Sequence, residues 1–348
     1  MKILIVKTSA FGDVIHTFPV LSYLRKKFPD AQIDWVVEKP ISHLVEAHPD
    51  VHRVYPIDSK QWRKLRSLGG FFHYRTQLRS ERYDLVLDLQ GNMKSGLVTF
   101  LAKAKEKVGF ARESVSEWPN LLFTNKRYNP PKGLNIREDY LSIVQQHFGD
   151  CEQFEDPGVV LEVSEEQRKK IEDILAQSEL REGKRVLVCP GSAWHNKQLP
   201  YETLRKVLQG MPGSSFLFLW GNDAEKVFAQ SLQQEFPEKS IVIDRMDLPS
   251  LQNLMSSMDL VFSMDSLPLH LAGTTTTPTF SLFGASSAEK YRPKGVQHCS
   301  LQGECPYGRT FEKRCPVLRT CPTGACIREL TSEQVLEAYD CPQGFGVR

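Results

Sequence analysis

Residues 2–13 decide the fold, because the stretch KILIVKTSAFGD is an aliphatic run at residues 2–6 that ends in a loop of small residues. An amphipathic stretch follows at residues 14–28, and a second apolar run comes at residues 32–37. The order of strand, helix and strand is typical of a βαβ unit in a parallel sheet. The sequence therefore predicts a first strand whose carboxyl end opens toward the N-terminus of a helix.

The same alternation of short apolar runs and amphipathic stretches continues through both halves of the chain. Further strands are predicted at residues 53–56, 84–87, 185–189, 216–220, 241–243, 260–263 and 278–283. Helices are predicted at residues 41–47, 60–82 and 93–103, and later ones are expected to be opened by Pro200, Asp223, Asp247 and Ser266. We expect Pro200 and Pro249 to lie in first helical turns, where a missing N–H costs nothing.

A polar helical stretch at residues 164–182 separates two series of this kind. We therefore predict an α/β protein with two Rossmann-like domains, residues 1–165 and 166–348, that face each other across a central cleft. Ligands of such domains bind beyond the carboxyl ends of the strands. The residues that directly follow the strands are therefore the candidates for function.

Composition excludes several other classes of protein. The chain has 348 residues, of which 41% are hydrophobic and 25% charged, as in ordinary globular proteins. A formal charge of +2 gives no overall attraction to nucleic acid, so no nucleic-acid partner is expected. No apolar run approaches the ~18 residues that a membrane span needs, and the N-terminus lacks the apolar core of a signal peptide. We expect a cytoplasmic protein.

The loop after the first strand is the first candidate site. Small residues between Lys7 and Asp13 precede a helix, whose free N–H groups suit an anion or a polar substrate. Gly12 stands alone, so neither the dinucleotide fingerprint nor a P-loop is present. Asp13 has two interpretations: a helix N-cap, or a carboxylate that takes a proton from a hydroxyl.

In the second half, three loops that follow strands carry candidate binding residues. Gly191, Ser192 and Lys197 in PGSAWHNK (residues 190–197) could hold a diphosphate, or form a solvated turn with a surface lysine. Asp265, Ser266 and His270 could lie at the same phosphates, or be a helix cap and a core histidine.

A third such loop contains Gly221 and Glu225. Gly221 permits close approach of a ligand, and the carboxylate of Glu225 could accept hydrogen bonds from both hydroxyls of a ribose. The alternative is an ordinary acidic residue in the first turn of a helix, where the helix dipole favours it.

Residues 60–82 are strongly basic, with aromatic residues interleaved and Glu81 as the one acid. The common explanation is a solvated helix face. The alternative is a segment that meets a polyanionic acceptor or an anionic membrane leaflet, where each exposed Lys or Arg contributes about 1 kcal/mol.

Five of the eight cysteines crowd into one late segment, at positions 299, 305, 315, 321 and 326. Structural zinc sites usually contain a tight C-x2-4-C pair, and only Cys321 and Cys326 come close to that spacing. Bound zinc, an iron–sulfur cluster, a local disulfide and reduced thiols all stay open from the sequence, and we expect no metal and no required cofactor. A non-catalytic metal or redox module built on these cysteines is one alternative to an enzyme.

Several of these segments together resemble a known family. They are IVKTSAFGDVIHTFP (residues 5–19), DWVVE (34–38), YDLVLDLQG (83–91), WG (220–221), and Asp265-Ser266 followed by His270. The chain resembles the bacterial lipopolysaccharide heptosyltransferases of glycosyltransferase family nine, and the likeness is closest to the branch that adds the first inner-core heptose. An oxidoreductase with paired Rossmann-like domains is disfavoured by the missing glycine fingerprint.

The resemblance implies a GT-B fold, ADP-L-glycero-D-manno-heptose as donor, a Kdo-bearing lipid A acceptor at the membrane surface, and inversion at the anomeric carbon without a metal. It implies a monomer at the cytoplasmic face of the inner membrane. Asp13 matches the general base, and the implied donor-binding residues are Gly191, Ser192, Lys197, Gly221, Glu225, Asp265, Ser266, Leu267 and His270. The implied acceptor-binding residues are Gly12, Lys60, Arg63, Lys64 and Arg112.

Two positions depart from the family pattern. Ser266-Leu-Pro-Leu stands where a Thr-Gly pair is common, and Lys197-Gln-Leu replaces a lysine-tryptophan pair. Both changes lie in the expected donor site, so a different nucleotide sugar is the alternative donor.

Overall fold

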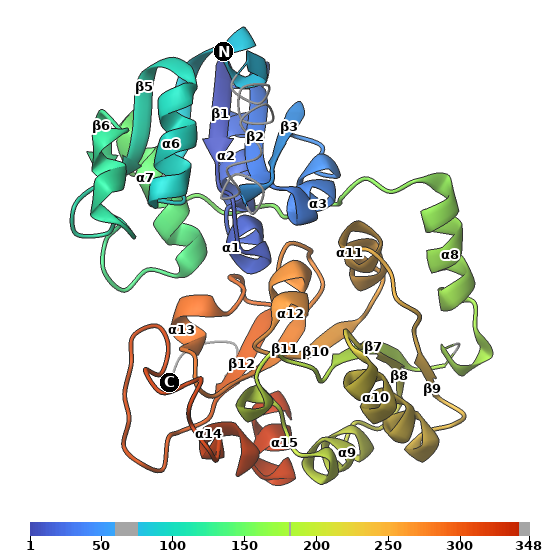
Figure 1. The fold of residues 1–348 in the computed structure, drawn as a ribbon. Coiled ribbons are helices and arrows are strands. Elements are labelled where there is room, and N and C mark those ends of the chain that lie inside the picture. The colour runs from blue at the N-terminus through green and yellow to red at the C-terminus, as the bar shows by residue number, and fades with distance from the viewer. Residues whose placement is uncertain (60–75, 181, 341–348) are drawn as a thin grey trace. The chain divides into compact units, whose positions relative to one another are not determined.

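The structure is a computed structural model, and it describes residues 1–59, 76–180 and 182–340 (Figure 1). The chain divides into two compact units, Met1–Glu162 and Val163–Arg348. Each unit contains one six-stranded sheet in which all strand pairs are parallel. The prediction of two α/β domains with parallel sheets is confirmed.

The strands of unit 1 follow the doubly wound order β3-β2-β1-β4-β5-β6. They are β1 (Lys2–Val6), β2 (Gln32–Glu38), β3 (Arg53–Ile57), β4 (Arg82–Asp88), β5 (Lys103–Phe110) and β6 (Lys126–Tyr128). In the central strand β1, Ile5 pairs with Trp35 on one side and Leu87 on the other. All three side chains are buried, as expected for strands covered on both faces.

Helices of unit 1 cover this sheet (Figure 1). They are α1 (Phe11–Ile15), α2 (Phe18–Lys27), α3 (Ser42–Glu46), α6 (Met93–Leu101) and α7 (Ile136–Phe148), with 3-10 turns η1 (Lys39–Ile41) and η3 (Trp118–Leu122). The single helix predicted at residues 14–28 is wrong, because two helices occur there. Pro19 has no N–H for the carbonyl of Ile15 and its ring would collide with that carbonyl, so the helix breaks between Ile15 and Phe18.

Unit 2 repeats the doubly wound order, β12-β11-β10-β7-β8-β9. Its strands are β7 (Lys184–Cys189), β8 (Ser214–Phe218), β9 (Ser240–Val242), β10 (Leu260–Met264), β11 (Thr279–Phe283) and β12 (His298–Gln302). Its helices are α8 (Glu165–Leu175), α9 (Tyr201–Gln209), α10 (Asp223–Glu235), α11 (Leu248–Ser256), α12 (Leu267–Ala272), α13 (Ala288–Tyr291), α14 (Ala325–Arg328) and α15 (Ser332–Asp340), with η4 (Ser178–Leu180) and η5 (His195–Lys197).

The nine predicted strands are confirmed to within a few residues, but β5, β6 and β12 are missing from the prediction. The sequence of β5 is KAKEKVGF, β6 has three residues, and β12 is HCSLQ. None of the three contains the apolar run by which buried strands are recognised. Of the helix predicted at residues 60–82, residues 76–80 are helical as expected, Arg82 instead begins β4, and residues 60–75 lie outside the described part.

The helix starts predicted in unit 2 are mostly confirmed. Asp247 and Ser266 occupy the N-cap positions of α11 and α12, and Asp223 is the first residue of α10. Pro249 lies in the first turn of α11 as expected. Pro200 does not lie in the first turn of α9 but one residue before it, at the N-cap, where extended backbone suits proline equally well.

The core of unit 2 reaches into the C-terminal segment. Phe216, Phe262 and Phe280 from the sheet are fully or almost fully buried, and Ile327 and Val335 from α14 and α15 join the same cluster. Helix α15 packs beside α9 (Figure 1). The segment of α14 and α15, up to Asp340, is thus an integral part of unit 2. Within the described residues, no helix is both long and apolar enough to span a bilayer.

In each sheet the chain first adds strands on one side of the central strand and then on the other. Two loops flank the point where this order switches. In unit 1 these are the loops after β1 and β4, and in unit 2 the loops after β7 and β10. The adjacent crossovers leave on opposite faces there, and ligands of doubly wound sheets typically bind at this point. The predicted residues Asp13, Lys197 and Asp265 all lie in these loops or the first helical turn after them.

Candidate active site

Asp13 lies at the carboxyl end of β1, in the first turn of α1. It is not the N-cap, since that position belongs to Ala10 and the helix begins earlier than expected, at Phe11. The Asp13 Oδ2 atom accepts the backbone N–H of Ala10 at 3.2 Å, and Oδ1 accepts the hydroxyl of Tyr140 at 3.3 Å. The side chain stays partly exposed, and each carboxylate oxygen has a second lone pair for a substrate proton.

Behind Asp13 lies a buried cation. The Nζ atom of Lys7 donates to the hydroxyl of Tyr140 at 2.8 Å and to the carbonyl of Leu89 at 3.0 Å, and it lies 4.1 Å from the centroid of the Tyr140 ring. Burial lowers the pKa of Lys7 to about 8, while the carboxylates of Asp13 and Asp88 act in the opposite direction. Lys7, Tyr140 and Asp13 thus form one hydrogen-bonded chain that orients the carboxylate.

The loop after β4 fixes the backbone that carries Asp13. Gln90 Oε1 accepts the N–H groups of Thr8 and Ser9, both at 3.0 Å. Asp88 in turn accepts the N–H groups of Gln90 and Gly91, and the side chain of Asn120 donates to it at 2.7 Å. Burial raises the pKa of Asp88, and these hydrogen bonds act in the opposite direction. The motif DLQG is therefore a support for the first loop.

In unit 2, a buried ion pair joins the loops after β7 and β10. Lys197 is only 8% exposed, and its ammonium donates to Asp265 and, at 2.7 Å, to the hydroxyl of Ser286. The Nε2 atom of His270 lies 3.7 Å from the other oxygen of Asp265. Burial opposes the ionisation of Asp265, but Lys197 and His270 outweigh it and hold the pKa of Asp265 below its ordinary value. The structure thus brings three of the predicted donor residues together.

A second predicted group meets at the ends of β7 and β8. Glu225 Oε2 accepts the N–H of Gly221 at 2.7 Å. A Cβ atom on Gly191 would lie 2.5 Å from the carboxyl carbon of Glu225, so a side chain at position 191 would displace this carboxylate from its present position. Asn222 caps α10 by accepting the N–H of Glu225. Gly191, Gly221 and Glu225 therefore form one compact group.

The remaining donor candidates line the same edge of the sheet. The carbonyl of Ser192 accepts the amide of Gln198 at 2.8 Å, which closes the loop after β7. Ser266 is the N-cap residue of α12, but its hydroxyl turns back to the carbonyl of Met264 instead of capping the helix. Pro268 has no N–H, so the first turn of α12 offers one donor fewer. The first N–H of that helix is the one of Leu267.

The acceptor candidates are less well grouped. Gly12 lies in α1 beside Asp13. Arg112 is exposed in the turn that follows β5, and that turn is tied back to the DLQG segment by the N–H of Glu117, which donates to the carbonyl of Gly91 at 3.0 Å. Lys60, Arg63 and Lys64 lie outside the described residues.

Sequence reasoning missed Lys7, Gln90, Tyr140 and Ser286 as parts of the site. Lys7 and Gln90 directly follow β1 and β4, so their position was a usable signal. Tyr140 and Ser286 come from α7 and from the loop after β11, and no local pattern links them to their partners. As to metals, in the part of the chain that the structure describes no cluster of three or more His, Cys, Asp or Glu side chains is arranged to hold an ion.

Fold and site together define a class, the glycosyltransferases with two Rossmann-like units of the GT-B fold. The model of glycosyltransferase family 9 (heptosyltransferase) matches residues 71–320, and the chain belongs to that family. The resemblance drawn from the sequence motifs is thereby confirmed, and so is the expectation of an enzyme.

Relatives and solved structures agree with this family. The chain is 29% identical over 323 residues to lipopolysaccharide heptosyltransferase 1 of Pseudomonas aeruginosa, covering 90% of this chain and 87% of that relative. The enzyme of the same name from Escherichia coli K12 is 27% identical over 82% of this chain and 88% of its own. The fold matches E. coli heptosyltransferase WaaC with ADP-2-deoxy-2-fluoro heptose, with a TM-score of 0.75 and 23% identity over 98% of this chain and 99% of that one.

The buried Lys7 predicts a specific pH dependence of stability. The folded protein loses the Lys7 proton near pH 8, whereas the unfolded chain keeps it until about pH 10.5, so unfolding takes up a proton between these values. The free energy of unfolding should therefore rise with pH across this window, by up to about 3 kcal/mol, relative to Lys7→Met. Urea unfolding of both proteins at several pH values measures the difference. Lys206→Met, on exposed α9, is the control, and a constant difference between wild type and Lys7→Met would contradict the account.

Proposed function

We propose that this chain is an inverting glycosyltransferase that transfers L-glycero-D-manno-heptose from ADP-heptose to a Kdo-lipid A type acceptor in the inner core of lipopolysaccharide. The observation that carries the proposal is the Asp13 carboxylate at the carboxyl end of β1, oriented by Tyr140 and backed by Lys7, in a member of the heptosyltransferase family. The names of the relatives support heptose as the sugar.

The reaction needs a base that takes the proton of the acceptor hydroxyl, and positive charge that stabilises the departing diphosphate. As the acceptor hydroxyl attacks the anomeric carbon, its proton passes to Asp13 and the bond from that carbon to the diphosphate breaks. Because the Lys7 ammonium lies behind Tyr140, the carboxylate is held in one orientation while one of its faces stays open. Attack and departure on opposite sides of the carbon give inversion.

In this proposal, unit 2 binds the donor. Negative charge grows on the departing ADP, and Lys197 with the N–H groups at the start of α12 would stabilise it. Asp265 holds the Lys197 ammonium in place until the diphosphate shares it. Glu225, fixed by the Gly221 N–H through one oxygen, keeps its other oxygen for the ribose hydroxyls.

Replacement of Asp13 tests the catalytic role. Asp13→Asn keeps the size of the side chain but cannot accept the hydroxyl proton, so turnover of ADP-heptose should fall about 10²- to 10⁴-fold while donor affinity stays within about twofold. Release of ADP and incorporation of heptose into the acceptor are the measurements. Asp84→Asn, an exposed carboxylate on β4, is the matched control. Near-normal turnover of Asp13→Asn would remove Asp13 from the mechanism.

Replacement of Lys197 tests the donor site. Lys197→Met removes the ammonium but keeps the length of the stem, and we expect ADP-heptose to bind about tenfold or more weakly, since a charge-assisted hydrogen bond contributes about 1.5–3 kcal/mol. Calorimetric titration with ADP-heptose, and with UDP- and GDP-sugars for specificity, measures this. Lys206→Met controls for loss of a lysine. Unchanged donor affinity together with an unchanged rate would refute the phosphate role.

We further propose that the enzyme works at the cytoplasmic face of the inner membrane, where its lipid-linked acceptor lies. Support comes from an exposed apolar face on unit 1, made by Met93, Phe100, Trp118 and Leu122, which are 48%, 60%, 71% and 73% exposed. Contiguous apolar exposure of this kind is typical of membrane or partner contacts. Trp and Leu are residues that insert at the boundary between lipid headgroups and acyl chains.

Contacts between α6 and η3 join these side chains into one surface. The rings of Phe100 and Phe123 pack with centroids 6.0 Å apart, and Phe123 lies against Gly96 of α6. The N–H of Met93 donates to Glu117 at 2.8 Å, just before η3. Lys105, Lys126 and Arg127 are exposed on the adjoining strands β5 and β6, and the Arg127 guanidinium donates to the carbonyl of Leu121. A basic rim around an apolar face fits an anionic leaflet.

Loss of the apolar face should weaken membrane binding without harm to the chemistry. The double variant Trp118→Ser/Leu122→Ser should sediment about tenfold or more weakly with vesicles of phosphatidylethanolamine and phosphatidylglycerol, since each buried side chain contributes about 1.5–3 kcal/mol. Turnover of a short soluble acceptor should stay unchanged. Val296→Ser, an isolated exposed apolar residue at 81%, is the control. Equal sedimentation of the double variant and wild type would refute this surface.

A further inference from the structure

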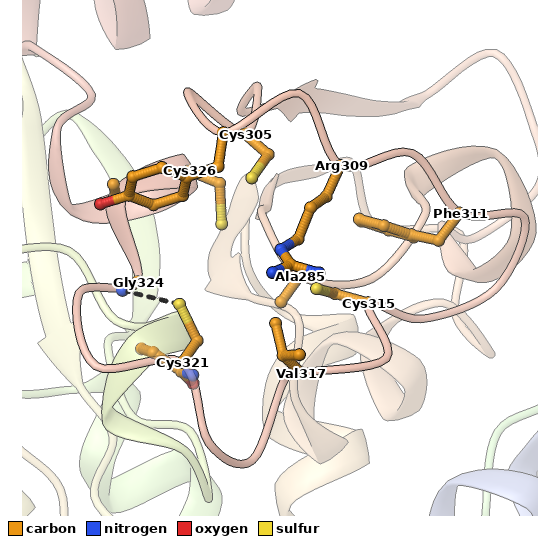
Figure 2. Close-up of a pocket in the computed structure, with 12 residues that line it drawn as sticks. Ala285, Cys305, Arg309, Phe311, Cys315, Val317, Cys321, Gly324 and Cys326 are labelled. Atoms are coloured by element: carbon orange, nitrogen blue, oxygen red, sulfur yellow. Dashed lines mark hydrogen bonds between the residues drawn. The ribbon is translucent and has the colours of Figure 1, made fainter.

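Four cysteines of unit 2 surround one small cavity. Cys305, Cys315, Cys321 and Cys326 line it, and its volume is about 30 Å³. Figure 2 shows the sulfur atoms of Cys305, Cys321 and Cys326 turned toward its interior, and that of Cys315 on its opposite side. Cys299, the fifth cysteine of the segment, is instead buried in the core of unit 2. The cavity therefore selects four of the five clustered cysteines.

The segment that carries these cysteines has little else to hold it together. Residues 303–324, between β12 and α14, contain no helix or strand, and most of their side chains are exposed. Loops without regular structure rarely exceed about 15 residues inside a compact domain unless they serve a function. Where such a segment cannot build an apolar core, disulfides or a metal ion commonly replace it. In residues 303–324 and at Cys326, four thiols surround a cavity where an apolar core would otherwise be needed.

Fixed polar groups around the cavity favour anionic sulfur. The N–H of Gly324 donates to the Cys321 sulfur at 3.4 Å, a hydrogen bond that favours the thiolate form. Four thiolates around one cavity would repel one another, and a cation bound among them would offset this repulsion. Arg309 adds a positive charge at the same cavity.

We propose that Cys305, Cys315, Cys321 and Cys326 bind a single metal ion of the zinc or iron type through four thiolates. Tetrahedral sites of four cysteines are typical of structural zinc and of iron bound to sulfur. A cavity of about 30 Å³ has room for one ion. The four sulfurs are not yet at coordinating positions, so the side chains turn inward on binding and each thiol releases its proton to solvent, with no electron transferred.

The ion would brace the donor site of unit 2. Cys315 N–H donates to the carbonyl of Ala285 at 2.8 Å, next to Ser286, whose hydroxyl accepts from Lys197. On the other side, the amide of Asn196, next to Lys197, donates to the carbonyl of Leu318 within the cysteine segment. Metal binding would thus restrain the backbone on either side of this contact, next to Ser286 and next to Lys197. This consequence rests on the proposed function, but the metal site itself does not.

Metal analysis of the purified full-length protein tests the site directly. We expect about one zinc or iron per chain, retained in Cys151→Ser and reduced at least tenfold in Cys321→Ser and in Cys326→Ser. Cys151 is an exposed cysteine of unit 1 and serves as the matched control. Element-resolved mass spectrometry distinguishes zinc from iron. Wild-type protein with neither metal, or with metal that survives both substitutions, would overturn the proposal.

A second measurement covers variants that fail to fold. Wild-type protein stripped with a chelator should melt at a lower temperature, regain its stability with one equivalent of Zn²⁺, and give the intense absorption of tetrahedral cobalt thiolate with Co²⁺. An intact mass short of two hydrogens for each bonded pair would instead reveal disulfides and overturn the proposal. If metal is present but its removal leaves donor affinity unchanged, the site stands and only its support of Lys197 fails.

Discussion

Parallel pairing of β1 with β4, and of β7 with β10, is the constraint on which both halves of the molecule depend. Because all strands of a sheet run the same way, their carboxyl ends meet at one edge, and side chains distant in the sequence become neighbours there. Gln90 can hold the backbone of Thr8 only because β1 and β4 are adjacent. Asp265 can meet Lys197 for the same reason in unit 2.

Each unit has a buried lysine at that edge, and the two lysines differ in the groups that surround them. Lys7 is surrounded by a hydroxyl, a carbonyl and an aromatic ring, so burial dominates and its pKa falls. Lys197 meets a carboxylate and a hydroxyl directly, and its partner Asp265 stays ionised despite its burial. The first arrangement orients a neighbouring acid, whereas the second pairs a buried cation with a buried carboxylate.

The sequence predicted most of the fold and part of the site, for reasons visible in particular residues. Strands such as β1 and β10 are mostly apolar and are easily recognised, whereas the first five residues of β5 are mostly charged and β6 has three residues. Lys197 and Asp265 were predicted for the same site from their places after strands, and the structure joins them. Tyr140 escaped notice because its contact with Asp13 spans 127 positions and depends on how α7 packs, which no local pattern records.

The absence of a side chain at Gly191 determines where the carboxylate of Glu225 can lie. The space that a methyl group would need at position 191 is filled by the carboxylate of Glu225, from a different strand and helix. A larger residue there would push the acid out, and a shorter acid would leave a gap that a methyl could fill. The contact of the Glu225 carboxylate with the N–H of Gly221 thus depends on the bare backbone at position 191.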